Sequence, residues 1–108
     1  MAEKLNDIIQ GDTVRWRLNW PTDITGATVQ FILERLEDQA TPDLALDATL
    51  DAANGDGDVL GASFEITPAQ SASLAKGNYN AGHKITLANG DVCTFLKQRI
   101  RVEDGLGL

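Results

Sequence analysis

Residues 78–102, NYNAGHKITLANGDVCTFLKQRIRV, carry the pattern that decides the fold class. In the first half, one phase of an alternating run holds Tyr79, Ala81, His83, Ile85 and Leu87. Asn89 and Gly90 follow, and Asn-Gly between two alternating runs is typical of a tight β-hairpin turn. In the second half, one phase holds Leu96, Ile100 and Val102. We therefore predict an antiparallel hairpin here.

The same two-residue period, which is that of a half-buried strand, recurs upstream. Three further runs have the inward phases Val14, Trp16, Leu18 and Trp20; Ala27, Val29, Phe31 and Leu33; and Leu60, Ala62, Phe64 and Ile66. Residues 34–43 are polar and contain Pro42, so we expect a connection there. Residues 44–50 place apolar side chains on one face, and residues 51–58, DAANGDGD, have the composition of a turn. We expect residues 44–50 and 60–66 to pair as a second hairpin.

Residues 67–77 carry the helical signal of the chain. Thr67 can cap a helix, Pro68 suits the first helical position, and Gln70 completes a capping box. Leu74 is expected to point inward. The segment is too short for more than about two helical turns.

Together these patterns predict an all-β sandwich of about seven antiparallel strands with Greek-key connections. A chain of 108 residues has the usual size of one domain. We expect a single domain over residues 1–103 and a flexible tail over residues 104–108. The predicted core consists of Val29, Phe31, Leu33, Leu60, Phe64, Ile66, Leu74, Tyr79, Ile85, Ile100 and Val102.

The composition excludes several classes of protein. Nine Lys and Arg stand against sixteen Asp and Glu, and a net charge of -7 disfavours binding to nucleic acid. Cys93 is the only cysteine, so no intramolecular disulfide can form. No apolar run approaches the ~20 residues of a membrane span, and residues 1–10 have no hydrophobic segment of the signal-peptide kind. We therefore expect a folded domain that binds neither nucleic acid nor membrane.

Residues 53–59, ANGDGDV, are similar to the start of a calcium-binding loop. Asn54, Asp56 and Asp58 place side-chain oxygens at alternate positions, and Gly57 allows a sharp bend. Aligning Gly57 with the loop glycine leaves the first and the last ligand positions without an acid. We therefore favour a hairpin turn, expect no cofactor, and keep the metal site as the alternative.

Four other side chains have both a functional and a structural interpretation. His83 could be a general base, but no nucleophile or orienting acid stands at a recognisable spacing, so we favour a structural role and predict no catalytic residue. Cys93 could be a reactive thiol, but we favour a small hydrophobe packed in a strand beside Phe95. Trp16 and Trp20 could stack on sugar rings, but they share the inward phase of their strand. We predict them in the core or at its edge, with Trp20 the more exposed.

Basic residues concentrate on the outward phases of two strands. They are Arg15, Arg17, Lys97, Arg99 and Arg101, five of the nine in the chain. This pattern fits a solvated sheet face and equally a docking surface for an acidic partner. Outward apolar residues that would need a cover are Ile32, Leu36 and Phe95. We predict both groups as interface candidates.

Four segments follow one another within residues 8–102: IIQGDTVRWRLNWP, DITGATVQFIL, FEITPAQSASLAKGNYNAGHKITLANGDV and RIRV. The order resembles the small immunoglobulin-like domains of tailed-phage and prophage structural proteins, and is similar to the N-terminal domain of baseplate upper proteins. The resemblance implies an immunoglobulin-like β-sandwich without catalytic residues, placed in a tail, baseplate or fibre. This chain lacks the long C-terminal extension of the baseplate proteins, which leaves a baseplate ring, a fibre adaptor and a capsid decoration open.

On this basis we expect a non-enzymatic virion structural protein that is made in the host cytoplasm. It would assemble in several copies, as a homo-oligomer or with other virion proteins. The alternatives are a capsid decoration protein and a carbohydrate-binding module for host-surface glycans.

Overall fold

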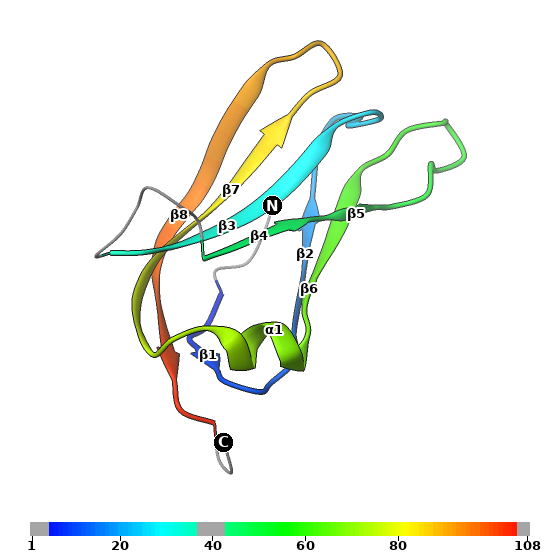
Figure 1. The fold of residues 1–108 in the computed structure, drawn as a ribbon. Helices are drawn as coiled ribbons and strands as arrows, with labels where there is room; N and C mark the ends of the chain where they lie inside the picture. The colour runs from blue at the N-terminus through cyan, green and yellow to red at the C-terminus, as the bar shows by residue number, and fades with distance from the viewer. Residues whose placement is uncertain (1–4, 37–42, 106–108) are drawn as a thin grey trace.

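The computed structural model describes residues 5–36 and 43–105 (Figure 1). Its elements are β1 (Ile8–Ile9), β2 (Val14–Asn19), β3 (Thr28–Arg35), β4 (Leu44–Asp47), β5 (Thr49–Leu50), β6 (Gly61–Ile66), α1 (Pro68–Ser73), β7 (Gly77–Thr86) and β8 (Val92–Glu103). Most of the predicted connection, residues 37–42, and the last part of the predicted tail, residues 106–108, lie outside the described residues.

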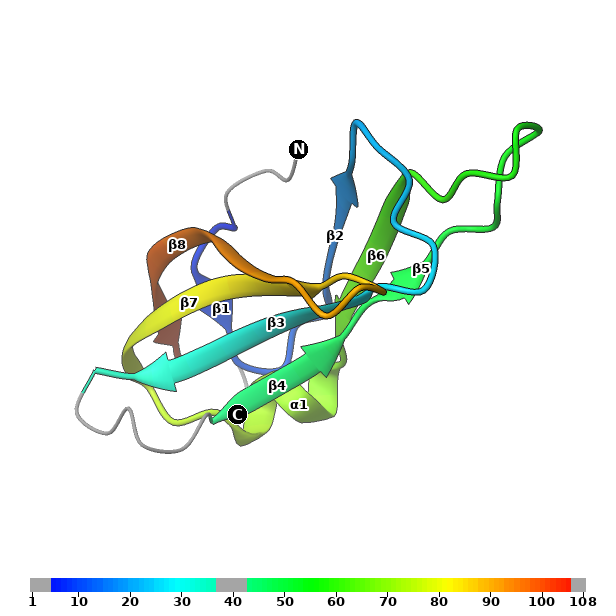
Figure 2. The same cartoon turned by 90° about the horizontal axis from the view of Figure 1, so that it is seen from above.

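The strands form two sheets that enclose the core (Figures 1 and 2). The larger sheet has the order β1-β8-β7-β3-β4, and the smaller has the order β2-β6-β5. Strands B, E and D on one sheet and C, F and G on the other define the immunoglobulin fold, and β2, β6 and β5 face β3, β7 and β8 in the same way. The predicted immunoglobulin-like sandwich is confirmed. It differs from the prediction in β1, which pairs with β8 in parallel through Ile8 and Ile9.

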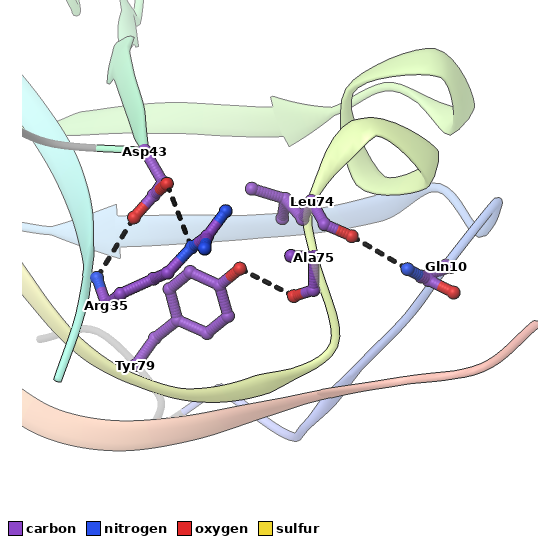
Figure 3. A network of polar contacts seen from close by, with 6 residues as sticks. All are labelled: Gln10, Arg35, Asp43, Leu74, Ala75 and Tyr79. Atoms are coloured by element: carbon purple, nitrogen blue, oxygen red, sulfur yellow. Dashed lines mark hydrogen bonds and ion pairs between the residues drawn. The ribbon is translucent and has the colours of Figure 1, made fainter. Parts of the chain in front are cut away.

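A buried tyrosine fixes the corner between α1 and β7. Tyr79 is 1% exposed, and its hydroxyl donates a hydrogen bond to the carbonyl oxygen of Ala75 at 2.5 Å (Figure 3). A tyrosine that bonds back to the backbone at this corner is a hallmark of immunoglobulin domains. Burial raises the pKa of the Tyr79 hydroxyl, so the group remains a neutral donor.

Two more contacts brace the same corner (Figure 3). Arg35, the last residue of β3, forms an ion pair of 3.3 Å with Asp43, and the Arg35 backbone N–H donates to the other Asp43 oxygen at 3.0 Å. Gln10 Nε2 donates to the carbonyl oxygen of Leu74 at 2.7 Å. The end of β1 is thus joined to the end of α1, and the end of β3 to the start of β4, beside Tyr79.

The predicted helix cap is present in α1. The Gln70 backbone N–H donates to Thr67 Oγ1 at 3.2 Å, and the Gln70 side chain accepts the Thr67 N–H at 2.8 Å, which is a complete capping box. Ser71 is fully buried and its hydroxyl donates to the carbonyl oxygen of Asp12 at 2.8 Å. This bond holds α1 against the segment that leads into β2.

Every residue of the predicted core except one is buried. Leu60 is 38% exposed, so its assignment to the core was wrong. The alternation breaks just before β6, because the Val59 N–H donates to the Asp23 carboxylate at 2.8 Å and the Val59 carbonyl accepts the Ile24 N–H at 2.9 Å. Val59 and Ile24 are therefore buried in the place predicted for Leu60.

The predicted strand over residues 44–50 divides between the two sheets. Its first part, β4, pairs with β3, whereas β5 pairs with β6. The chain crosses between the sheets at Ala48, whose N–H donates to the Val29 carbonyl at 2.7 Å. The predicted hairpin with residues 60–66 is therefore correct only for Thr49 and Leu50.

A β-bulge interrupts the predicted hairpin of β7 and β8. Ala81 pairs with Gln98 and His83 pairs with Phe95. Two residues of β8 therefore lie opposite a single residue of β7, Gly82. One of the two is Leu96, which has a φ of 51°. The extra residue reverses the phase of β8, as bulges do. Phe95 faces the core, and its prediction as an outward residue was wrong.

Candidate interaction surface

The outer face of the larger sheet carries a hollow over strands β3, β7 and β8. Cross-strand pairing forms three rows: Gln30, Lys84 and Thr94; Ile32, Gly82 and Lys97; and Glu34, Asn80 and Arg99. A cavity of about 230 Å³ opens over the middle row. We call it the sheet hollow, and its outward lining is Ile32, Glu34, Asn80, Gly82, Lys84, Thr94 and Lys97.

The hollow exists because a glycine lies where the surrounding side chains converge. A Cβ atom at Gly82 would meet no atom closer than Lys97 Cγ, at 3.6 Å, so a side chain would stand in the open space. The bulge on β8 turns Lys97 toward the same spot. A glycine inside a strand that borders a bulge often marks a place where another chain approaches closely.

The charges around the hollow distinguish it from the rest of the surface. Five of the eight described basic residues form ion pairs within the chain: Arg15, Arg17, Arg35, Lys76 and Arg101. The other three, Lys84, Lys97 and Arg99, make no ion pair with any described residue. Lys84 and Lys97 line the hollow, and Arg99 lies beside Lys97 in the adjoining row, where Glu34 is the acid among the described neighbours. In a protein of net charge -7, the described basic residues that form no ion pair therefore lie together on one face.

The predicted interface candidates do not form a single surface. On the outer face of the larger sheet lie Ile32, Leu36, Lys97, Arg99 and Arg101. Arg15 and Arg17 lie on the outer face of the smaller sheet and pair with Glu65 at 2.7 Å and Asp51 at 2.5 Å. Phe95 is inside, 5.5 Å from the ring of His83. The predicted basic docking surface is thus split between two opposite faces.

His83 links the two sheets inside the core. The Trp16 indole N–H on β2 donates to His83 Nε2 on β7 at 3.0 Å, and His83 is 1% exposed. The imidazole is surrounded by the rings of Phe31, Phe64 and Phe95. Burial lowers the pKa of His83 to about 4. These contacts fit the structural role that we favour for this histidine.

The calcium-loop candidates form a closed turn. Asn54 Oδ1 accepts the backbone N–H groups of Asp56 at 2.9 Å and of Asp58 at 3.0 Å. The amide oxygen that would bind a cation is therefore occupied by the backbone. In residues 5–36 and 43–105 no group of three or more His, Cys, Asp or Glu side chains could hold a metal ion.

The remaining candidates differ from one another in exposure. Trp16 is 8% exposed and Trp20 is half-buried against Phe95, with ring centroids 5.1 Å apart, as predicted. Cys93 is exposed, so the expectation of a packed apolar residue was wrong. Cys93 lies near the start of β8. This part of β8 forms an edge of the sheet, because β1 pairs with β8 only at Val102 and Glu103.

Gly82 and Lys84 were not identified from the sequence. The signal that could have indicated them is a glycine in the middle of an alternating run, flanked by outward Asn80 and Lys84.

Among the residues that the structure describes, no helix has the length and apolar character to cross a membrane.

Comparisons with known proteins give little further information. No protein-family model and no curated protein matches the sequence. The crystal structure of CopC from Methylosinus trichosporium OB3b is similar over 100% of this chain and 90% of that chain, with 12% sequence identity and a TM-score of 0.49. A likeness of this size says nothing about what the present chain binds or does.

Proposed function

We propose that the chain is a non-enzymatic assembly module that docks a partner on the outer face of its larger sheet. The observation that carries the proposal is the sheet hollow, which is lined by Lys84 and Lys97 and flanked by Arg99, three cations that form no ion pair with any described residue. Cations grouped in this way attract an acidic partner and set its orientation more than they add to affinity. Ile32 supplies an apolar contact at the centre of the same face.

The more specific proposal is a virion structural protein of a tailed phage or prophage, in a tail, baseplate or fibre. It is supported by the sequence resemblance and by the immunoglobulin-like strand order. A role in decorating a capsid would use the same face. The carbohydrate-binding alternative has less support, because Trp16 is buried and Trp20 packs against Phe95.

The test is to locate the protein in purified particles by mass spectrometry and electron microscopy. We expect the wild-type chain in particles, and we expect the charge-reversed variant Lys97→Glu/Arg99→Glu to be excluded from them. A matched control is Arg15→Glu/Lys76→Glu, which changes the net charge equally but away from the hollow, and should be incorporated. A chain found only free in the host cell, and never in particles, would refute the proposal.

A further inference from the structure

The loop between β5 and β6 ends in a narrow acidic tip, residues 54–58. Figures 1 and 2 show this loop running away from both sheets. Cβ atoms at Gly55 and Gly57 would meet no atom within 4 Å, so the tip stands clear of the rest of the chain. Gly57 has a φ of +82°, and the two hydrogen bonds accepted by Asn54 Oδ1 hold the turn closed. The tip is therefore narrow, and its conformation is preorganised before any partner binds.

The tip carries negative charge that the described part of the chain does not neutralise. Asp56 is exposed and Asp58 is half-buried, and neither forms an ion pair with a described residue. The tip belongs to the smaller sheet, whereas the sheet hollow lies on the outer face of the larger one. The two therefore lie on different layers of the sandwich in one molecule.

We propose that the tip of one copy docks in the sheet hollow of a second copy, with Asp56 and Asp58 facing Lys84, Lys97 and Arg99. This inference rests on the proposed function as an assembly module and names the partner, another copy of the chain. A hollow of about 230 Å³ is small, and a turn with two glycines can enter it where a bulkier segment could not. We place this contact in the heterologous class, with the tip of each copy in the hollow of the next and no reciprocal contact, so that it builds rings or open filaments rather than closed pairs.

The net charge of -7 opposes the approach of two copies at long range. At physiological ionic strength charges beyond roughly 8 Å are largely screened, so the close pairs between tip and hollow decide the outcome. A contact of this size is weak, and self-association should be measured at protein concentrations up to roughly 1 mM.

The experiment is sedimentation velocity on two complementary variants. Asp56→Asn/Asp58→Asn neutralises the tip, and Lys97→Gln/Arg99→Gln, the hollow variant, removes two of the three positive charges at the hollow. We expect the wild-type chain to form species larger than a dimer, and each variant alone to be monomeric. An equal mixture of the two retains one intact tip and one intact hollow, so it should form a heterodimer and nothing larger.

The two variants shift the net charge in opposite directions. A general charge effect would strengthen the association of the tip variant and weaken that of the hollow variant, whereas the proposed contact requires both to weaken. The control Arg15→Gln/Lys76→Gln removes the same charge as the hollow variant and should associate as the wild type does. If Asp58→Asn disturbs folding, Asp56→Asn alone alters an exposed side chain and should still weaken association.

A monomeric wild-type chain at the highest concentration, or a mixture that does not recover association, would overturn the inference. The proposed function would survive if the same chain were still present in particles. Binding of inorganic phosphate or of a polyglutamate peptide to the hollow, measured by calorimetry on a chain that does not self-associate, would also assign the hollow to another acidic partner and overturn the inference.

Discussion

At the level of single residues, the hydrogen bond between Trp16 and His83 sets a condition on the charge of the core. His83 Nε2 accepts the indole N–H, so the neutral ring must carry its proton on Nδ1, which has no partner among the described residues. Protonating Nε2 would place two donors against each other and a charge among aromatic rings. This is why the folded state resists protonation of His83.

Folding stability should therefore fall in mild acid. The pKa of His83 is lowered from 6.5 to about 4 by burial, so the unfolded chain takes up the proton first as the pH falls. The contribution of neutral His83 to the free energy of unfolding is complete above pH 6.5 and is lost as the pH falls from 6.5 to 4. It corresponds to roughly 3 kcal/mol. Urea denaturation followed by tryptophan fluorescence from pH 7 to 4.5 measures it. His83→Gln should flatten this dependence, and equal slopes for both proteins would contradict the assignment.

The cost of removing a side chain should follow its burial. Phe31 is fully buried and lies edge-on to Trp16 at 4.9 Å, so Phe31→Ala should reduce the free energy of unfolding by about 3 to 5 kcal/mol. Leu60 is 38% exposed, so Leu60→Ala should cost less than about 1 kcal/mol. Chemical denaturation of the two variants measures both values. Comparable losses would mean that Leu60 belongs to the core after all.

At the level of elements, the corner between α1 and β7 offers a matched pair of hydroxyl deletions. Tyr79→Phe removes a buried hydrogen bond to the Ala75 carbonyl and should cost about 1 to 2 kcal/mol. Ser73→Ala removes an exposed bond to the Gln70 carbonyl, of 2.8 Å, and should cost less than about 0.5 kcal/mol. Thermal unfolding of both variants compares them. Equal shifts in melting temperature would show that the tyrosine does not fix the corner.

The elements that the sequence predicts well are those with local causes. The α1 cap needs only Thr67 and Gln70, and the Asn89-Gly90 turn needs only its two residues. The predictions failed where a distant part of the chain decides. The chain changes sheets after Ala48 because the next residue, Thr49, pairs with Ser63 on β6, and the phase of β8 reverses at Leu96 because of its pairing with β7. Alternation within a strand carries no information on either event.

At the level of the whole molecule, the candidate surface was only partly predictable for the same reason. The sequence places basic residues on outward phases, but it does not show which of them find an acid. Arg15 is neutralised by Glu65, 50 residues away in the chain, whereas Lys97 and Arg99 are not paired with any described residue. The hollow itself depends on Gly82 facing a bulge on a neighbouring strand.

Filling the hollow should block docking without changing any charge. Gly82→Ala adds a Cβ at an ordinary contact distance of 3.6 Å from Lys97 Cγ, so folding stability should change by less than about 1 kcal/mol. Gly82→Leu extends a side chain into the space and should exclude the chain from particles and from self-association, with an unchanged circular dichroism spectrum. Normal incorporation of the leucine variant would show that the partner binds elsewhere.

The parallel pairing of β1 with β8 determines how the domain would carry a mechanical load. Ile8 and Ile9 lie beside Val102 and Glu103, so segments near opposite ends of the chain run side by side. The Gln10 N–H adds a bond to the Glu103 carbonyl at 3.0 Å, and the Arg101 N–H adds one to the Asp7 carboxylate at 3.0 Å. Tension applied through residues 5 and 105 would slide these two strands past each other, loading the bonds together instead of peeling them one by one. The rupture force should therefore be higher for pulling through these two points than for pulling across the β7–β8 hairpin.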